Sequence, residues 1–231
     1  MKIAVMADIH ANIHALNAVL HDCEKECVEK FWLLGDYVDY GAATIPVLNK
    51  LKSLRAEHAL AGNHDACLFS VHIRPSQTPH GYASYQHTKM QYEKNADSFS
   101  WLKDLLPSQI AQGGNTLLVH GTPNDPYWGK FLPTDTSTLQ EIISYMEINN
   151  HEYLFMGHSH ISFMLTLDGR RIINPGSVGQ PRNGYPNAQY LIFDDGEIIF
   201  KNICYDINAA ASEIEAAGLP EYLSKRLFIG K

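Results

Sequence analysis

The sequence lacks the marks of a membrane protein and of a cysteine-based metal or redox protein. No apolar run reaches the ~18 residues that a membrane helix needs. The apolar stretch 1–7 is too short for a secretory signal and ends at Asp8. The chain has 4 cysteines but no Cys-x-x-Cys pair, so a zinc knuckle or a thioredoxin motif has no support. We therefore expect a cytoplasmic, reduced protein with no membrane partner.

Positive charge is also scarce. The chain of 231 residues has 18 Lys and Arg against 25 Asp and Glu, a formal net charge of −7. This balance and the lack of a basic appendage argue against nucleic acid as a partner, because backbone binding depends on cationic groups. With 45% hydrophobic and 19% charged residues, the composition is typical of a globular protein. The length predicts a single domain over 1–231, and nothing in the sequence indicates the oligomeric state.

The first third of the chain alternates between strand and helix patterns. An apolar strand is predicted at 2–7, followed by an amphipathic helix from Ile13 with Asn12 as its N-cap. A second strand at 31–34, a helix at 44–54 and a third strand at 57–61 follow. This β-α-β-α-β order predicts parallel strands joined by right-handed crossovers.

The rest of the chain has a different pattern. We expect helical structure at 80–106, and a hairpin of 109–112 and 116–120 around Gly113-Gly114-Asn115. After a helix at 137–148 and a strand at 153–156, the remaining strands are predicted to be antiparallel, and one short helix after Asp206 to close the chain. Parallel strands followed by antiparallel strands favour two facing sheets with helices outside.

Polar side chains of metal-ligand type follow the predicted strands, where each strand ends. Ligands of open α/β sheets bind beyond such strand ends. Each short motif alone is more typical of a turn than of a site, but five of them in this order are hard to attribute to packing. Leaving so many polar groups buried and unpaired would cost several kcal/mol, which bound metal ions would offset. The residues concerned are Asp8, His10, Asp36, Asp39, Asn63, His64, His120, His158 and His160.

The spacing of these residues resembles that of a known family. The blocks Asp8-x-His10, Gly35-Asp36-x-x-Asp39, Gly62-Asn63-His64-Asp65, His120 and Gly157-His158-x-His160 are similar to those of the calcineurin-like metallophosphoesterases. The run 174–182, which reads NPGSVGQPR, resembles the small bacterial and archaeal branch of that superfamily. The resemblance implies an α/β fold, a four-layer α/β/β/α sandwich of two facing mixed sheets.

The resemblance also implies two metal ions and a set of ligands for them. The first ion would be held by Asp8, His10 and His160, the second by Asn63, His120 and His158, and Asp36 would bridge both. Nitrogen and oxygen ligands without thiolate suit Mn, Fe, Zn or Co. Such a pair of ions can share a bridging hydroxide that attacks a small phosphorylated substrate.

Other residues are expected to act on the substrate. His64 follows the ligand Asn63 and is the general-acid candidate, and the resemblance gives Asp39 the role of orienting it, against a simple turn residue. Arg182 is either a phosphate-binding or a solvated loop residue. Asn12 either contacts phosphate or only caps its helix. The run Asp125-Pro126-Tyr127-Trp128, in the loop after His120, is the candidate specificity element. Its aromatic rings either stack on the substrate or pack against their own loop.

Tyr40 departs from one part of the family. Protein serine/threonine phosphatases of the superfamily have Arg directly after the second Asp of the second block, where this chain has Tyr40. We therefore do not expect a dedicated phosphoprotein phosphatase.

The leading functional prediction is a dinuclear metal-dependent hydrolase of phosphomonoesters or phosphodiesters. A dinucleoside polyphosphate pyrophosphohydrolase is the alternative enzyme, because the same centre supports it. The alternative of another class is a metal-free protein-interaction scaffold. A scaffold that had lost its metals would lack some of the ligand residues. Since this sequence has all of them and His64, it favours the enzyme.

Overall fold

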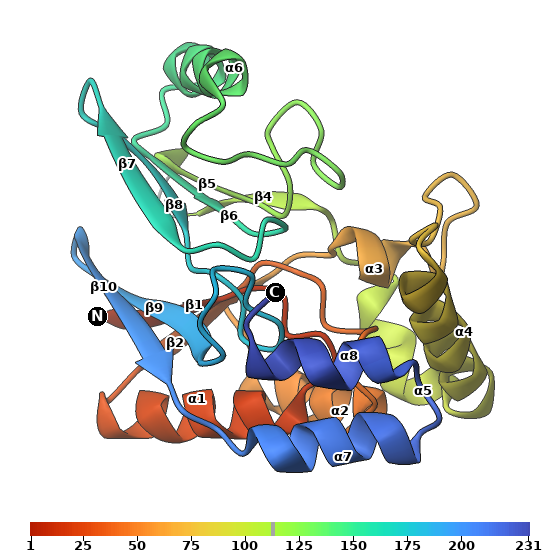
Figure 1. Cartoon of the computed structure of the whole chain (residues 1–231). Helices are drawn as coiled ribbons and strands as arrows, with labels where there is room; N and C mark the ends of the chain where they lie inside the picture. The colour runs from red at the N-terminus through yellow and green to blue at the C-terminus, as the bar shows by residue number, and fades with distance from the viewer. Residues whose placement is uncertain (112–113) are drawn as a thin grey trace.

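Two five-stranded sheets face each other in the chain (Figure 1). The computed structural model describes residues 1–111 and 114–231. The first sheet has the order β10-β9-β1-β2-β3, and the second has the order β4-β5-β6-β8-β7. The strands of the first sheet are β1 (Lys2–Met6), β2 (Lys30–Leu33), β3 (His58–Ala59), β9 (Ala188–Asp194) and β10 (Glu197–Ile203). The strands of the second sheet are β4 (Ser108–Ala111), β5 (Thr116–Val119), β6 (Tyr153–Met156), β7 (Phe163–Leu167) and β8 (Arg170–Asn174).

Both sheets are mixed. In the first, β1, β2 and β3 are parallel, as the β-α-β-α-β pattern predicts, and β9 is antiparallel to β1. In the second, the β4–β5 hairpin forms as expected, although its Gly113 lies outside the described residues. The antiparallel pairing predicted for the later strands is confirmed for β7 with β8 and for β9 with β10, whereas β6 pairs in parallel with β5 and also with β8. The helix between β5 and β6 provides the crossover that this parallel pairing requires.

Helices cover the outer face of each sheet and complete four layers (Figure 1). Helices α1 (Ile13–Lys25) and α2 (Thr44–Leu54) pack on the first sheet, and α6 (Thr136–Ile148) packs on the second. The predicted N-cap of α1 is confirmed, since the Asn12 side chain accepts a hydrogen bond from the Ala15 N–H at 3.0 Å. The α/β/β/α sandwich expected from the sequence is therefore observed.

The alternation of side chains along β1 explains how the layers hold together. Ala4 and Met6 contact the helices of the first layer, whereas Ile3 and Val5 lie between the two sheets. Successive strand residues point to opposite faces, so an entirely apolar strand fits a sheet that is covered on both sides. The layer between the sheets also contains Trp32.

The middle of the chain is helical, as expected, in several short pieces. These are α3 (Asn63–Ala66), α4 (Pro79–Lys94), α5 (Ala96–Phe99) and the 3₁₀ turn η1 (Ser100–Leu102). None of the described helices is both long and apolar enough to cross a lipid bilayer.

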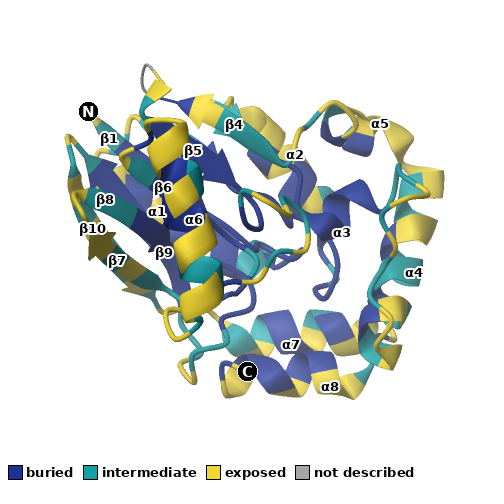
Figure 2. Cartoon of the chain, turned by 90° about the horizontal axis from the view of Figure 1, so that it is seen from above, coloured by how far each residue is buried: buried dark blue, intermediate teal, exposed yellow. Residues whose placement is uncertain are grey.

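The C-terminal region contains more structure than the one short helix predicted. It forms α7 (Ile207–Ala216), α8 (Glu221–Lys225) and the 3₁₀ turn η3 (Arg226–Phe228). Figure 2 shows α7 and α8 side by side. Ile214 of α7, Leu223 of α8 and Leu227 of η3 pack with Tyr40, in the loop that follows β2. The C-terminal helices therefore lie against one of the loops that carry the predicted site.

Candidate metal centre

Seven of the predicted side chains converge where the strands end, as the sequence predicts. One atom from each of Asp8, His10, Asp36 and His160 lies within 4.8 Å of the others, and the same holds for Asp36, His120 and His158. Asp36 belongs to both groups. Asn63 joins the second group, because its Oδ1 lies 3.1 Å from Nε2 of His120. The chain therefore brings together two adjacent sets of ligand atoms that share one carboxylate.

The distances within these sets leave space for small cations rather than for a protein side chain. Nε2 of His120 is 3.3 Å from Oδ2 of Asp36, and Nε2 of His10 is 3.7 Å from the same oxygen. Nε2 of His160 is 3.5 Å from Oδ1 of Asp8 and 3.2 Å from Nε2 of His10. Nitrogen and oxygen atoms at these separations, with no thiol among them, suit Mn, Fe, Zn or Co.

Three of the histidines are oriented by the protein backbone. Nδ1 of His10 lies 2.9 Å from the Val38 carbonyl oxygen, Nδ1 of His120 lies 2.7 Å from that of Leu34, and Nδ1 of His160 lies 2.6 Å from that of Gln180. A ring that donates its Nδ1–H to a carbonyl leaves Nε2 free as a ligand atom. All three rings therefore present Nε2 to the cluster.

The cluster is buried and requires positive charge. Asp8, His10, Asp36, Asn63, His120 and His160 are each 0–2% exposed. Oδ2 of Asp8 has no hydrogen-bond partner among the described residues. Burial, together with the nearby Asp36 carboxylate, raises the pKa of Asp8 to about 7. Cations between these groups would stabilise the ionised carboxylates and satisfy the free oxygen, so the residues fit a metal centre.

Burial and the nearby carboxylates shift the pKa values of the cluster histidines in opposite directions. Burial favours the neutral ring of His120, but the Asp36 and Asp8 carboxylates outweigh it and raise the pKa of His120 to about 9. Burial lowers the pKa of His160 well below its ordinary value, so that ring is neutral and able to bind a metal. A metal ion would replace the proton that the carboxylates attract to His120.

The backbone at the strand ends adopts a conformation that non-glycine residues rarely take. The φ angles are +54° at Asp8, +46° at His10, +58° at Asp36, +62° at His158 and +58° at His160. Left-handed backbone costs of the order of 1–3 kcal/mol for such a residue and is concentrated at functional sites. The strain lies at five of the seven converging residues, and the fold maintains it.

Gly62 allows the loops after β2 and β3 to meet. A Cβ atom at this position would lie 2.0 Å from Oδ1 of Asp36. The same oxygen accepts a hydrogen bond from the His64 N–H at 2.9 Å. A side chain at Gly62 would therefore displace the carboxylate shared by both ligand sets.

Asp65 is a buried residue of the site for which the sequence analysis assigned no role. Its Oδ2 accepts hydrogen bonds from the N–H groups of Asp36 at 2.7 Å and Gly62 at 2.9 Å, and its Oδ1 accepts one from Tyr37 at 2.9 Å. Its signal in the sequence is its place in the block Gly62-Asn63-His64-Asp65. Asp65 ties the loop of Asp36 to the start of α3 and so positions the ligands without belonging to either ligand group.

Replacing Asp65 by Asn is expected to destabilise the protein and weaken metal binding. The amide has one acceptor oxygen in place of two, so at least one buried N–H loses its partner, at a cost of about 1–3 kcal/mol. Urea unfolding and a titration with Mn²⁺ measure the two effects. The exposed Asp104, as Asp104→Asn, is the matched control. Unchanged stability and metal affinity in Asp65→Asn would contradict this positioning role.

His64 lies beside the ligand cluster and is paired with Asp39. Nδ1 of His64 is 2.7 Å from Oδ2 of Asp39, and Asp39 is 1% exposed. Burial favours the neutral ring, but Tyr40, Asp36 and Asp39 together raise the pKa of His64 to about 10. These neighbours therefore favour the charged form of the ring, whose Nδ1 faces the Asp39 carboxylate.

The two predicted substrate-binding residues lie next to the cluster in different ways. Oδ1 of Asn12 caps α1, and its Nδ2 donates to the Gly179 carbonyl oxygen at 3.0 Å, so both ends of the amide have protein partners. Arg182 lies beside the ligand His160, because its backbone N–H donates to the His160 carbonyl oxygen at 3.0 Å. Its Nη2 donates to Oε1 of Gln180 at 2.9 Å.

The predicted specificity loop lies at the same end of the sheets. The Trp128 ring is 42% exposed and stands edge-on to His158, with 6.2 Å between ring centroids. Tyr127 is half-buried. Trp128 is therefore an exposed aromatic surface beside a residue of the second ligand set.

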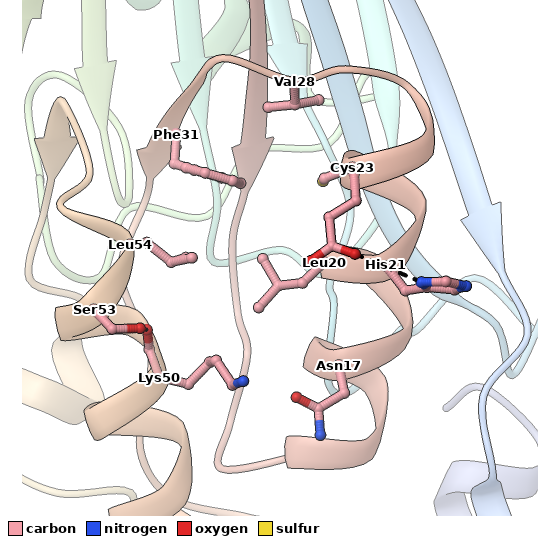
Figure 3. A pocket seen from close by; sticks show the side chains of 10 residues that line it. Asn17, Leu20, His21, Cys23, Val28, Phe31, Lys50, Ser53 and Leu54 are labelled. Atoms are coloured by element: carbon pink, nitrogen blue, oxygen red, sulfur yellow. Dashed lines mark hydrogen bonds and ion pairs between the residues drawn. The ribbon is translucent and has the colours of Figure 1, made fainter.

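A separate pocket lies away from these residues. It measures about 330 Å³ and lies between α1 and α2, with Leu20, Phe31 and Leu54 in its wall and Lys50 at its rim (Figure 3). No residue of the metal cluster lines it. The chemistry suggested by the side chains is therefore at the strand ends and not in this pocket.

Known proteins are similar to this chain in sequence or in fold. An uncharacterized protein of Methanocaldococcus jannaschii is 32% identical over 99% of this chain and 98% of its own length. The crystal structure of a metallophosphoesterase from Sphaerobacter thermophilus is 30% identical, with a TM-score of 0.83 and full coverage of both chains. A hypothetical protein from Pyrococcus horikoshii has the same fold, with a TM-score of 0.88 at 24% identity, over 100% of this chain and 98% of its own.

The model of the calcineurin-like phosphoesterase superfamily domain matches residues 1–196. This range contains all seven converging side chains as well as His64 and Asp39. The chain therefore belongs to the calcineurin-like phosphoesterase superfamily and is a metal-dependent phosphoesterase.

Proposed function

We propose that this chain hydrolyses small phosphomonoesters or phosphodiesters at a centre for two metal ions, with His64 as the general acid. The observation that carries the proposal is the pair of ligand groups that share Asp36. Asp8, His10 and His160 would hold one ion with Asp36, and Asn63, His120 and His158 the other. When bound, two such ions lower the pKa of a water molecule and offset negative charge on the phosphoryl oxygens.

The remaining steps fall to side chains of this chain. Hydrolysis leaves an alkoxide that requires a proton, and a protonated imidazole beside the reacting group can supply it. Support for His64 in this role comes from its contact with Asp39 and from its position directly after the ligand Asn63. Asp39 would hold the ring in one orientation and stabilise its charged form, as a positioning residue.

Removal of the metal ions is expected to abolish activity and to lower stability. Dialysis against a chelator such as dipicolinate should abolish hydrolysis of p-nitrophenyl phosphate or bis(p-nitrophenyl) phosphate, and Mn²⁺ should restore it. Ions that bind only the folded chain add about 2.7 kcal/mol at 100 times their Kd, so the melting temperature should fall with the metal. Metal analysis should find two ions per chain. A protein that binds no metal and hydrolyses neither compound would contradict the proposal and favour the scaffold alternative.

A further inference from the structure

One large aromatic side chain is exposed beside the metal centre. The Trp128 ring is 42% exposed, and its centroid lies 6.2 Å from that of His158, with the two ring planes perpendicular. Trp128 belongs to none of the four apolar clusters formed by the described residues. Packing within the protein therefore does not explain this ring. Single exposed apolar residues are common on protein surfaces, and what distinguishes Trp128 is its position next to a metal ligand.

The ligand cluster is open to solvent at the residue that Trp128 contacts. Among the seven converging side chains, His158 is half-buried. The other six are 0–2% exposed, namely Asp8, His10, Asp36, Asn63, His120 and His160. A phosphoryl group that enters from solvent therefore approaches the ligands over His158. The part of a bound substrate that faces solvent then lies next to the Trp128 ring.

The loop that carries Trp128 is closed on itself by hydrogen bonds. The carbonyl oxygen of Asp125 accepts hydrogen bonds from the N–H groups of Thr122 at 3.1 Å and Gly129 at 2.9 Å. Oδ1 of the same Asp125 accepts one from the Trp128 N–H at 3.1 Å. A Cβ atom at Gly129 would lie 2.0 Å from Oγ1 of Thr122, so the two sides of the loop are in contact. These bonds fix the backbone of Trp128 from within the loop.

Both ends of this loop are tied to the site and to the core. The loop begins directly after the ligand His120, whose carbonyl oxygen accepts a hydrogen bond from the Gly157 N–H at 2.9 Å. Just beyond the loop, Phe131 is 0% exposed and packs with residues of α6. The position of Trp128 relative to the ligands is therefore set before a substrate binds. A group held in this way loses little freedom on binding, which favours affinity.

We propose that Trp128 stacks with a planar aromatic group of the substrate, beyond the phosphoryl group at the metal centre. The inference rests on the proposed function and narrows its substrate class to phosphoesters that contain an aromatic ring, either a nucleobase or an aryl group. An aromatic side chain stacks with any flat ring, whatever hydrogen-bonding groups the ring has. Trp128 thus determines specificity and takes no part in breaking the ester bond.

Pairs of ligands that differ by one flat ring test the proposal on the metal-loaded protein. Adenosine monophosphate has an adenine base that ribose 5-phosphate lacks, and phenylphosphonate has a ring where methylphosphonate has a methyl group. In at least one pair we expect the ring to lower the inhibition constant roughly five-fold or more, measured by competition with bis(p-nitrophenyl) phosphate hydrolysis. A larger gain with adenosine monophosphate indicates a nucleotide substrate, and a larger gain with phenylphosphonate indicates an aryl ester.

Variants of Trp128 show whether this side chain provides the gain. Trp128→Ala should bring the two inhibition constants of each pair close together, because the stacking surface is lost. Trp128→Phe should keep part of the gain, since Phe has a smaller aromatic face. A merely structural role of Trp128 would instead change both constants of a pair by the same factor.

Tyr82→Ala is the matched control. Tyr82 is an aromatic residue of α4 with 47% exposure, and its ring lies 6.1 Å from that of Tyr85 rather than beside a metal ligand. This variant should keep the full gain. Loss of the gain in Tyr82→Ala as well as in Trp128→Ala would contradict a specific site at Trp128.

The outcomes separate this proposal from the proposed function. A wild type that hydrolyses neither p-nitrophenyl ester contradicts the proposed function itself. A wild type that is active but shows no gain in either pair overturns only the stacking site. The stacking site is also overturned if Trp128→Ala is folded by circular dichroism and retains the gain.

If Trp128→Ala does not fold, the tryptophan fluorescence of the wild type decides. The chain has 3 tryptophans, of which Trp32 is 0% exposed, Trp101 is half-buried and Trp128 is exposed. A ring stacked on Trp128 should quench its emission. The probe is adenosine monophosphate or phenylphosphonate, whichever shows the gain, and unchanged emission at a saturating concentration overturns the stacking site.

Discussion

Replacing Asp36 by Asn is expected to remove bound metal and activity together. Asp36 is the one side chain common to both ligand groups, and its Oδ2 lies within 3.7 Å of Nε2 of both His10 and His120. The amide nitrogen of Asn cannot coordinate a cation. The substitution also removes the negative charge that attracts both ions. Loss of an outer partner of a metal ligand costs roughly 10–100-fold, and we expect a larger loss here.

Metal analysis and the hydrolysis of bis(p-nitrophenyl) phosphate measure this effect. The exposed Asp104→Asn makes the same chemical change away from the site and should keep both metal and activity. Burial disfavours the charged form of Asp36, but the nearby His120, His64 and His10 outweigh it and hold the pKa of Asp36 well below the ordinary value. The carboxylate is therefore ionised at neutral pH. An Asp36→Asn protein with two bound ions and normal turnover would refute the shared-ligand role.

Replacing His64 by Ala is expected to keep both metal ions and to slow turnover. The loss should reach roughly 10²–10⁴-fold for alkyl phosphates, whose alkoxide leaving group requires a proton. It should be much smaller for p-nitrophenyl phosphate, since p-nitrophenolate leaves without protonation. This dependence on the leaving group separates a general acid from a metal ligand, whose loss would slow both substrates.

Two further variants isolate the role of the His64–Asp39 contact. Asp39→Asn keeps the imidazole but removes the carboxylate 2.7 Å from Nδ1, so it should reproduce part of the His64→Ala defect with the same dependence on the leaving group. His21→Ala removes an exposed imidazole and should have no effect. Equal losses for alkyl and p-nitrophenyl substrates in His64→Ala would exclude a role in proton donation.

Local patterns in the sequence predict much of the fold. The apolar residues of β1 and the helical spacing of α1 indicate a strand and an amphipathic helix, because each element buries one or two faces at a fixed period. The helix N-cap at Asn12 follows from the same local rule. The direction of β6 relative to its neighbours does not follow from a local rule, since its pairing with β5 and β8 depends on how distant segments pack.

The sequence by itself determined which side chains could form the metal centre. Asp8, Asp36, Asn63, His120 and His158 stand beside strand ends, and the carboxyl ends of parallel strands meet at one edge of a sheet. Their residue types and spacing also indicate the family, because both can be read directly along the sequence.

Only the tertiary structure decided which residues surround that centre. Asp65 holds three backbone N–H groups of the loops, and Arg226 reaches Tyr40 from a segment some 180 positions away in the chain. Although Asp65 stands in the block Gly62-Asn63-His64-Asp65, neither role follows from a local pattern, because each depends on the packing of separate elements against one another. The physical reason is that contacts between distant segments are fixed by burial and shape, which no local pattern of residues encodes.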